Sequence, residues 1–64
     1  MPRRYRVETL TRLYDEWHAE HHTDSLAVAE GYITMLIRTH RIRSGRVVDQ
    51  ETGAVISQKP DPGR

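Results

Sequence analysis

Four arginines follow one another closely near the middle of the chain and form its strongest chemical signal. A guanidinium group binds phosphate oxygens in a bidentate manner, so the block predicts a phosphate-contacting surface that binds nucleic acid. Three arginines near the N-terminus are candidates for the same surface. The seven candidate nucleic-acid-binding residues are Arg38, Arg41, Arg43, Arg46, Arg3, Arg4 and Arg6.

The distribution of charge leaves two other interpretations of this basic block open. Residues 7–30 carry six carboxylates and one arginine, whereas residues 31–46 carry four arginines and no carboxylate. Cations near the end of a helix complement the helix dipole, which is a purely structural role. The block would also suit an acidic protein partner, including the acidic part of a second copy of the chain.

Three histidines and one aspartate form a second group with chemical potential. If residues 6–22 are helical, Asp15, His18 and His22 share one face, with His21 beside them. A structural zinc site normally has four ligands, and this group offers three. The pattern therefore favours a solvated histidine-rich helix end and predicts neither a metal site nor a cofactor. A surface that titrates near the ordinary histidine pKa is the alternative.

Nothing in the sequence indicates nucleophilic catalysis. The chain has no cysteine, its serines lie in no recognisable nucleophile motif, and no glycine-rich loop resembles a phosphate-binding loop. A chain of 64 residues also has little room for a pocket that excludes water. We therefore expect a binding protein rather than an enzyme.

The size of the chain predicts one small domain of marginal stability. A domain of about 60 residues buries only about 60% of its unfolded surface. Without disulfides, this predicts a stabilising metal, self-association or a low melting temperature. The basic N-terminal segment is not followed by the apolar stretch of a signal peptide. No apolar run is long enough to span a membrane. With no cysteine, these features predict a cytoplasmic protein.

Two helical patterns are predicted to position these residues. Val7, Leu10 and Leu13 begin an apolar stripe that continues to Trp17, which predicts a first helix over about residues 6–22. A cap at Thr23, Asp24 or Ser25 should begin a second helix that runs to about residue 40, with Gly45 ending the helical part. The second helix has a broad apolar stripe, which predicts one contact surface for the first helix and another for the hairpin or for a second copy of the chain. Its candidate interface residues are Val28, Tyr32, Met35 and Gly31.

The last element is predicted to be a β-hairpin over residues 46–57. Two β-branched runs flank a turn in which Asp49 can accept from the backbone two residues on, and Gly53 can adopt a positive φ. Residues 58–64 contain two prolines and no periodicity, which predicts a disordered tail after a domain of residues 1–57.

The predicted fold is therefore α+β: a two-helix antiparallel hairpin followed by a C-terminal β-hairpin, assembled as a homodimer. The predicted core consists of Trp17, Leu10, Leu13, Ile33, Leu36 and Ile37. Truncating Trp17 to Ala is expected to remove about 3–5 kcal/mol of stability if the residue is in the core. For function, the sequence predicts a small nucleic-acid-binding accessory or regulatory protein. The alternative is a protein-interaction module, such as an adaptor, inhibitor or assembly subunit, that binds no nucleic acid.

Overall fold

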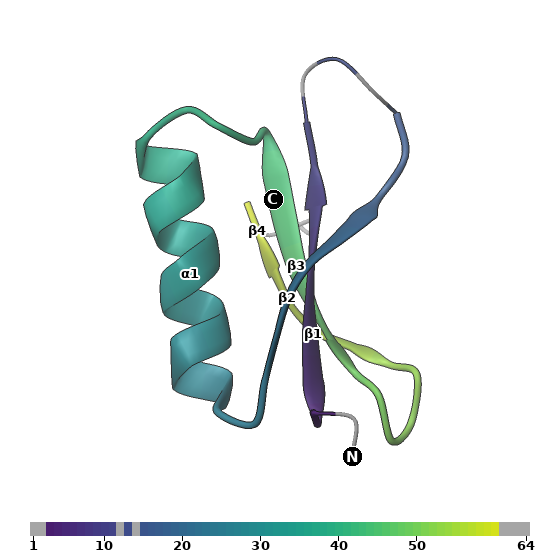
Figure 1. The fold of residues 1–64 in the computed structure, drawn as a ribbon. Helices are drawn as coiled ribbons and strands as arrows, with labels where there is room; N and C mark the ends of the chain where they lie inside the picture. The colour runs from purple at the N-terminus through teal and green to yellow at the C-terminus, as the bar shows by residue number, and fades with distance from the viewer. Residues whose placement is uncertain (1–2, 12, 14, 61–64) are drawn as a thin grey trace.

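The described part of the chain, residues 3–11, 13 and 15–60, forms one helix packed on one face of a four-stranded antiparallel sheet (Figure 1). This computed structural model places the strands in the order β2-β1-β3-β4. The elements in chain order are β1 (Tyr5–Leu10), β2 (His18–Thr23), α1 (Leu26–Arg38), β3 (Ser44–Asp49) and β4 (Val55–Lys59). Since β1 lies between β2 and β3, it is hydrogen-bonded along both of its edges.

The predicted first helix is wrong, and with it the two-helix hairpin. Residues 5–10 form the central strand β1, in which Val7 and Thr9 are almost fully buried beneath α1. Arg6 and Glu8 point to the opposite face of the sheet, as alternate strand residues must. The buried positions therefore repeat every two residues, and the helical spacing of Val7 and Leu10 is coincidental.

The link between β1 and β2 places two predicted core residues outside the core. Leu13 is 85% exposed, so its assignment to the core is wrong. Trp17 is half-buried and lies against Arg46, away from the buried cluster under α1. Tyr14, which completed the predicted stripe, lies outside the described residues.

The predicted second helix is confirmed as α1, although it ends earlier than expected. Ser25 is its N-cap, and the Ser25 hydroxyl accepts from the backbone N–H of Val28 at 3.2 Å. Helical structure ends at Arg38, and His40 then adopts a positive φ of 59°. Gly45, which was expected to end the helical part, is a buried residue of β3.

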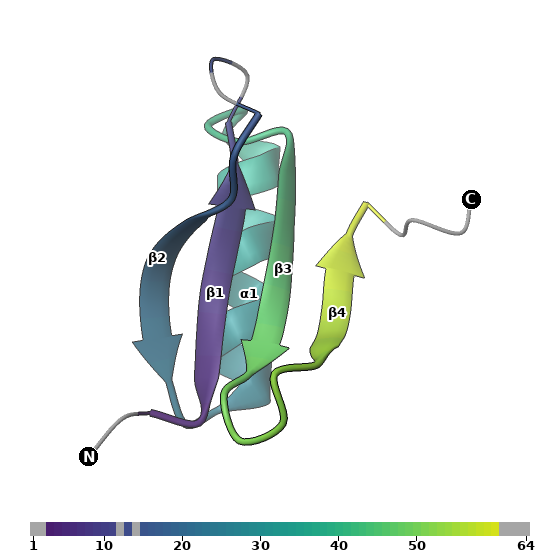
Figure 2. The ribbon, with the colours of Figure 1, turned by 90° about the vertical axis from the view of Figure 1, so that its right-hand side faces the viewer.

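The hydrophobic core lies between α1 and the sheet. Its fully buried members are Val7, Ala29, Ile33 and Val47. From the predicted core, Ile33 and Leu36 are buried, and Ile37 is partly buried against the cluster. Figure 2 shows α1 behind the strands, so that the other side of the sheet, here called the outer face, has no helix against it in the described part of the chain.

The predicted hairpin is confirmed as β3 and β4. Asp49 Oδ1 accepts from the backbone N–H of Glu51 at 2.9 Å, and Gly53 has a φ of 79°, as the turn chemistry predicted. The strand β4 extends through Lys59, so it includes two residues that the sequence placed in a tail. Pro60 follows the strand, and residues 61–64 of the predicted tail lie outside the described residues.

The topology brings three chain segments to one end of the molecule. The chain runs along α1 away from the N-terminal residues, returns through β3 and comes back along β4 (Figure 1). The end of α1, the start of β3 and the end of β4 therefore share one end of the fold. None of the helical segments in the described residues is both long and apolar enough to cross a membrane.

Candidate functional site

Three cationic side chains converge on one hollow at this end of the molecule. The hollow has a volume of about 330 Å³ and lies between α1, the approach to β3 and the end of β4. Its cations come from three separate segments. The residues that line it are Arg38, Arg43, Lys59, Thr34, Ile37 and Pro60. We call this the basic hollow.

Two of the predicted arginines at this end form no ion pair with a carboxylate of the described residues. Arg38 and Arg41 are exposed, and neither forms an ion pair with a carboxylate in the part of the chain that the structure describes. Arg43 Nη2 lies 2.9 Å from Asp15 Oδ1, but the Asp15 side chain is 96% exposed. An ion pair so open to water adds little stability, so an anion can replace Asp15 at low cost.

Lys59 is a member of the basic hollow that sequence reasoning missed. It was assigned to the tail because two prolines follow it closely, at residues 60 and 62. In the structure it is the last residue of β4 and pairs with Gly45 of β3. No sequence signal extends the strand beyond Ser57, because Gln58 and Lys59 are both polar.

Two N-terminal arginines lie at the other end of the molecule and are held by carboxylates. Arg3 Nη1 lies 3.1 Å from Asp24 Oδ2, just before α1 begins. Arg4 Nη2 lies 3.2 Å from Asp49 Oδ2 and 3.5 Å from Glu51 Oε2. Hydrogen bonds from the Arg4 backbone N–H and the Arg3 side chain lower the pKa of Asp24. Neither arginine joins the basic hollow.

The remaining two predicted arginines lie on the outer face of the sheet and share one carboxylate. Arg6 Nε donates to Glu8 Oε2 at 2.9 Å, and Arg46 Nε donates to Glu8 Oε1 at 2.6 Å. The Arg46 guanidinium also lies over the Trp17 ring, 4.2 Å from its centre. These contacts fix both guanidinium groups within the sheet face and partly neutralise them.

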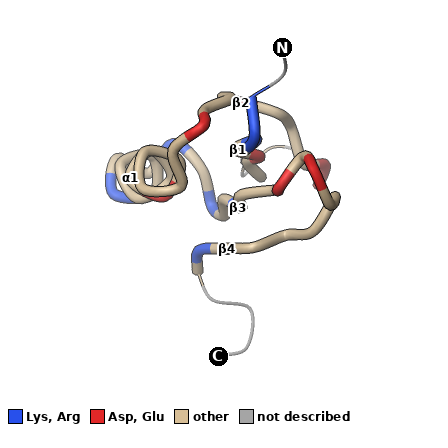
Figure 3. Tube along the Cα trace, turned by 90° about the horizontal axis from the view of Figure 1, so that it is seen from below, with Lys and Arg blue, Asp and Glu red and all other residues tan. Residues whose placement is uncertain are grey.

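The seven predicted arginines therefore do not form one surface. Figure 3 shows blue lysine and arginine positions on α1, at the end of β4 and at the start of β1, in separate parts of the molecule. The acidic segment, residues 7–30, supplies the carboxylates that pair with Arg3, Arg6, Arg43 and Arg46, whereas Arg4 pairs with Asp49 and Glu51 of the hairpin. The structure brings Arg38 and Arg43 together with Lys59 in the basic hollow, and Arg41 is not among its lining residues. The other four arginines lie elsewhere.

The histidines do not share a helix face, because residues 18–23 form a strand. His21 stacks on Tyr32 of α1, with ring centres 4.8 Å apart and planes 15° apart. His22 follows it in β2 and points to the other side of the sheet. The described residues contain no group of three histidine, cysteine, aspartate or glutamate side chains that could hold a metal ion.

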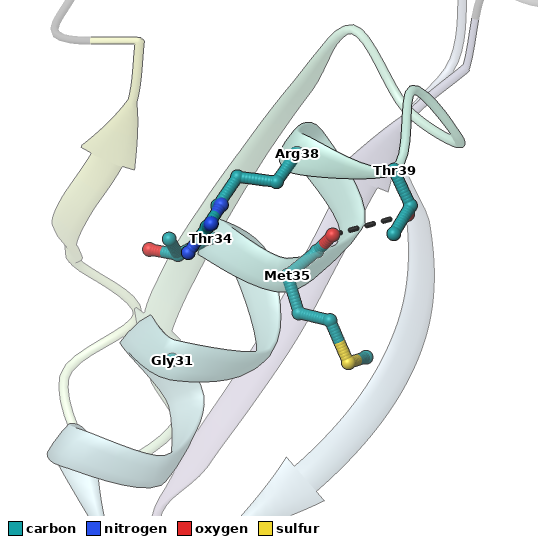
Figure 4. A pocket seen from close by; sticks show the side chains of 5 residues that line it. All are labelled: Gly31, Thr34, Met35, Arg38 and Thr39. Carbon is teal, nitrogen blue, oxygen red and sulfur yellow. Dashed lines mark hydrogen bonds between the residues drawn. The ribbon is translucent and has the colours of Figure 1, made fainter.

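Three of the four predicted interface residues are exposed, and the fourth, Tyr32, is partly buried. Val28 and Met35 are each 52% exposed on the side of α1 that faces away from the sheet, and Gly31 lies between them. Tyr32 instead packs against the core and against His21. A shallow hollow of about 520 Å³ lies on this exposed side (Figure 4). Its lining residues are Gly31, Thr34, Met35, Arg38 and Thr39.

No protein-family model, curated protein or solved structure matches this chain in the comparisons made. The fold is a small α+β domain whose described residues present a basic hollow at one end and an uncovered helix side next to it.

Proposed function

We propose that this chain is a small nucleic-acid-binding accessory or regulatory protein that contacts phosphates through the end of the fold where α1 and β4 finish. The observation that carries the proposal is the convergence of Arg38, Arg43 and Lys59 on one hollow from three separate segments. Arg41 follows Arg38 by three residues and is a further exposed cation just beyond the end of α1. The role is binding rather than catalysis.

The chemistry of the basic hollow suits a ligand with both phosphate and apolar parts. Its cations can bind phosphate oxygens, and arginine does so in a bidentate manner. Ile37 and Pro60 add an apolar wall against which a sugar or base can pack. The carbonyl end of α1 carries a partial negative charge that offsets a fraction of this cationic field, so several cations are needed for net attraction.

The first experiment is fluorescence anisotropy of labelled duplex DNA, single-stranded DNA and RNA, across a salt series from about 50 to 200 mM. Four phosphate contacts predict a slope of log affinity against log salt of about −3 to −4. Arg38→Ala and Arg41→Ala should each lower the magnitude of the slope by about one.

Arg3→Ala is the matched control, because it removes the same charge from the opposite end of the molecule. It should leave the affinity and the salt slope close to those of the wild-type protein. Absence of binding at the lowest salt would overturn the proposal. An equal loss of affinity in Arg3→Ala and Arg41→Ala would also overturn it, because binding would then follow net charge alone.

A protein-interaction module remains the second candidate, and one observation favours it. The side of α1 that faces away from the sheet is apolar at its middle and uncovered, although α1 supplies much of the core on its other side. The two functions use neighbouring surfaces and can coexist in one protein.

A further inference from the structure

The basic hollow adjoins the shallow hollow on the side of α1 that faces away from the sheet. The two hollows share Thr34 and Arg38 among their lining residues. We call the shallow one the helix hollow. In Figure 4 the Arg38 side chain extends along α1 towards Thr34. A ligand too long for one hollow therefore reaches the other by passing Arg38.

The charged side chains that line these two hollows are all cations. Among the described residues they are Arg38, Arg43 and Lys59, and no carboxylate lines either hollow. Arg38 forms no ion pair with a carboxylate in the described part of the chain. Arg41 lines a third hollow next to Met35. This surface is therefore complementary to a ligand that carries several negative charges.

Each of the two hollows also offers an apolar surface beside its cations. In the helix hollow this surface is Met35, which is 52% exposed and extends outward from α1 (Figure 4). Gly31 leaves the helix backbone bare next to it, and a Cβ atom there would meet no atom within 4 Å. In the basic hollow, Ile37 and Pro60 are apolar. A thioether packs favourably against an aromatic ring, so the surface suits a ligand that alternates anionic and aromatic groups.

A single strand of nucleic acid has this alternation, because each nucleotide carries one phosphate and one aromatic base. In a duplex the bases are paired and stacked inside, whereas the bases of a single strand are free to pack against a protein. The basic hollow, at about 330 Å³, lies at the lower end of the range of about 300–1,000 Å³ that is typical of small-ligand sites. It is large enough for a nucleotide and far too narrow for a duplex.

The charges of α1 argue against its insertion into the major groove of a duplex. A helix in that groove has phosphates along its whole length on both sides. In α1 the cation is Arg38, in the last turn, and the first half carries Glu30. Asp24 lies just before the helix. Attraction for phosphates is therefore confined to one end of α1.

We propose that the basic hollow and the helix hollow together bind a short stretch of single-stranded nucleic acid. The phosphates lie on the cations, and unpaired bases pack against Met35 and Ile37. The inference rests on the proposed function, because it names the form of nucleic acid that the phosphate-contacting end selects. Phosphate contacts supply most of the affinity, and the base contacts supply the preference for a single strand.

Fluorescence anisotropy with three labelled ligands of equal length tests the proposal. They are a single strand, its duplex, and an abasic strand that keeps every phosphate but has no bases. The single strand should bind at least about fivefold more tightly than either of the others. Its salt slope should equal that of the abasic strand, since the phosphate contacts are the same. The comparison is made with DNA and with RNA, and the preference in either one supports the proposal.

Met35→Ala tests the base contact in the helix hollow. It should weaken binding of the single strand by about two- to tenfold and leave binding of the abasic strand unchanged. Val28→Ala is the matched control, because Val28 is also 52% exposed on α1 but lines neither hollow. It should change neither affinity. Circular dichroism establishes that both variants are folded.

The outcomes separate this inference from the proposed function on which it rests. Absence of binding to all three ligands at the lowest salt would overturn both. If all three ligands bind but the abasic strand or the duplex binds as tightly as the single strand, this inference alone is overturned. Equal losses in Met35→Ala and Val28→Ala would likewise overturn it, and the exposed side of α1 would then belong to the protein-interaction candidate.

Discussion

The Ile33 side chain lies so close to Gly45 that no other residue type fits at position 45 without a rearrangement. A Cβ atom at Gly45 would lie 2.6 Å from Cγ2 of Ile33 and 3.0 Å from its Cγ1. Ile33 is fully buried at the centre of α1, and Gly45 is a buried residue of the neighbouring strand β3. This contact sets how closely the helix approaches the sheet, and hence the geometry of the basic hollow at the end of α1.

Gly45→Ala is therefore expected to destabilise the protein by overpacking, by about 1–3 kcal/mol. Urea unfolding followed by circular dichroism measures the loss. Shortening Ile33 to Ala removes both clashing atoms, so Gly45→Ala should be less costly in that background. Sulfate in the buffer keeps the double variant folded for the comparison. An equal cost in both backgrounds would show that the Ile33 contact is not the cause.

Gly31→Ala should have the opposite effect, although it is the same chemical change. Gly31 lies within α1, has no positive φ and has open space around its missing Cβ. Alanine is about 1 kcal/mol more favourable than glycine inside a helix, so the unfolding free energy should rise by about that amount. Urea unfolding followed by circular dichroism measures the change. A destabilised Gly31→Ala variant would contradict this account of α1.

The sequence contained enough local information for about half of the fold. The cap at Ser25, the stripe through Ile33 and the turn chemistry of Asp49 and Gly53 are short-range signals, and each predicted its element correctly. The predicted helix over residues 6–22 failed because it rested on the apolar residues alone, whereas the buried face of β1 is formed by Val7 and the polar Thr9. The alternation of Tyr5, Val7 and Thr9 was the available signal for β1.

The strand β2 shows why the remainder could not be predicted. Its sequence, His18–Thr23, contains few residues that favour strands, and most of its side chains are exposed. It is a strand because β1 offers its edge, a contact between residues far apart in the chain. The basic hollow depends on similar long-range contacts, so the sequence suggested Arg38 and Arg43 but not their meeting with Lys59.

The contact between Arg46 and Trp17 predicts a measurable coupling on the outer face of the sheet. The guanidinium lies 4.2 Å from the ring centre, and both side chains are only partly buried. A double-mutant cycle with Trp17→Ala and Arg46→Ala should give a coupling of about 0.5–1 kcal/mol. The matched cycle uses Arg6→Ala, since Arg6 also binds Glu8 but does not cover the ring. Equal coupling in the two cycles would argue against the cation–π contact.

Asp49 should make the stability of the protein depend on pH in the acid range. The backbone N–H of Glu51, followed by the Arg4 side chain, lowers the pKa of Asp49, against the opposing effect of partial burial. Because the folded state favours the ionised form, this contribution is fully present above the ordinary aspartate pKa of about 3.9. It is lost as the pH falls through the lowered pKa of the folded state.

The unfolding free energy of the wild-type protein should therefore decrease below about pH 4, and more steeply than that of Asp49→Asn. Urea unfolding at a series of pH values measures both profiles. Asp49→Asn should be less stable than the wild type at neutral pH, and the difference should shrink as the pH is lowered. Asp24 also has a lowered pKa and is unchanged in this variant, so a weaker acid dependence remains. Parallel profiles for the two proteins would show that Asp49 does not carry the effect.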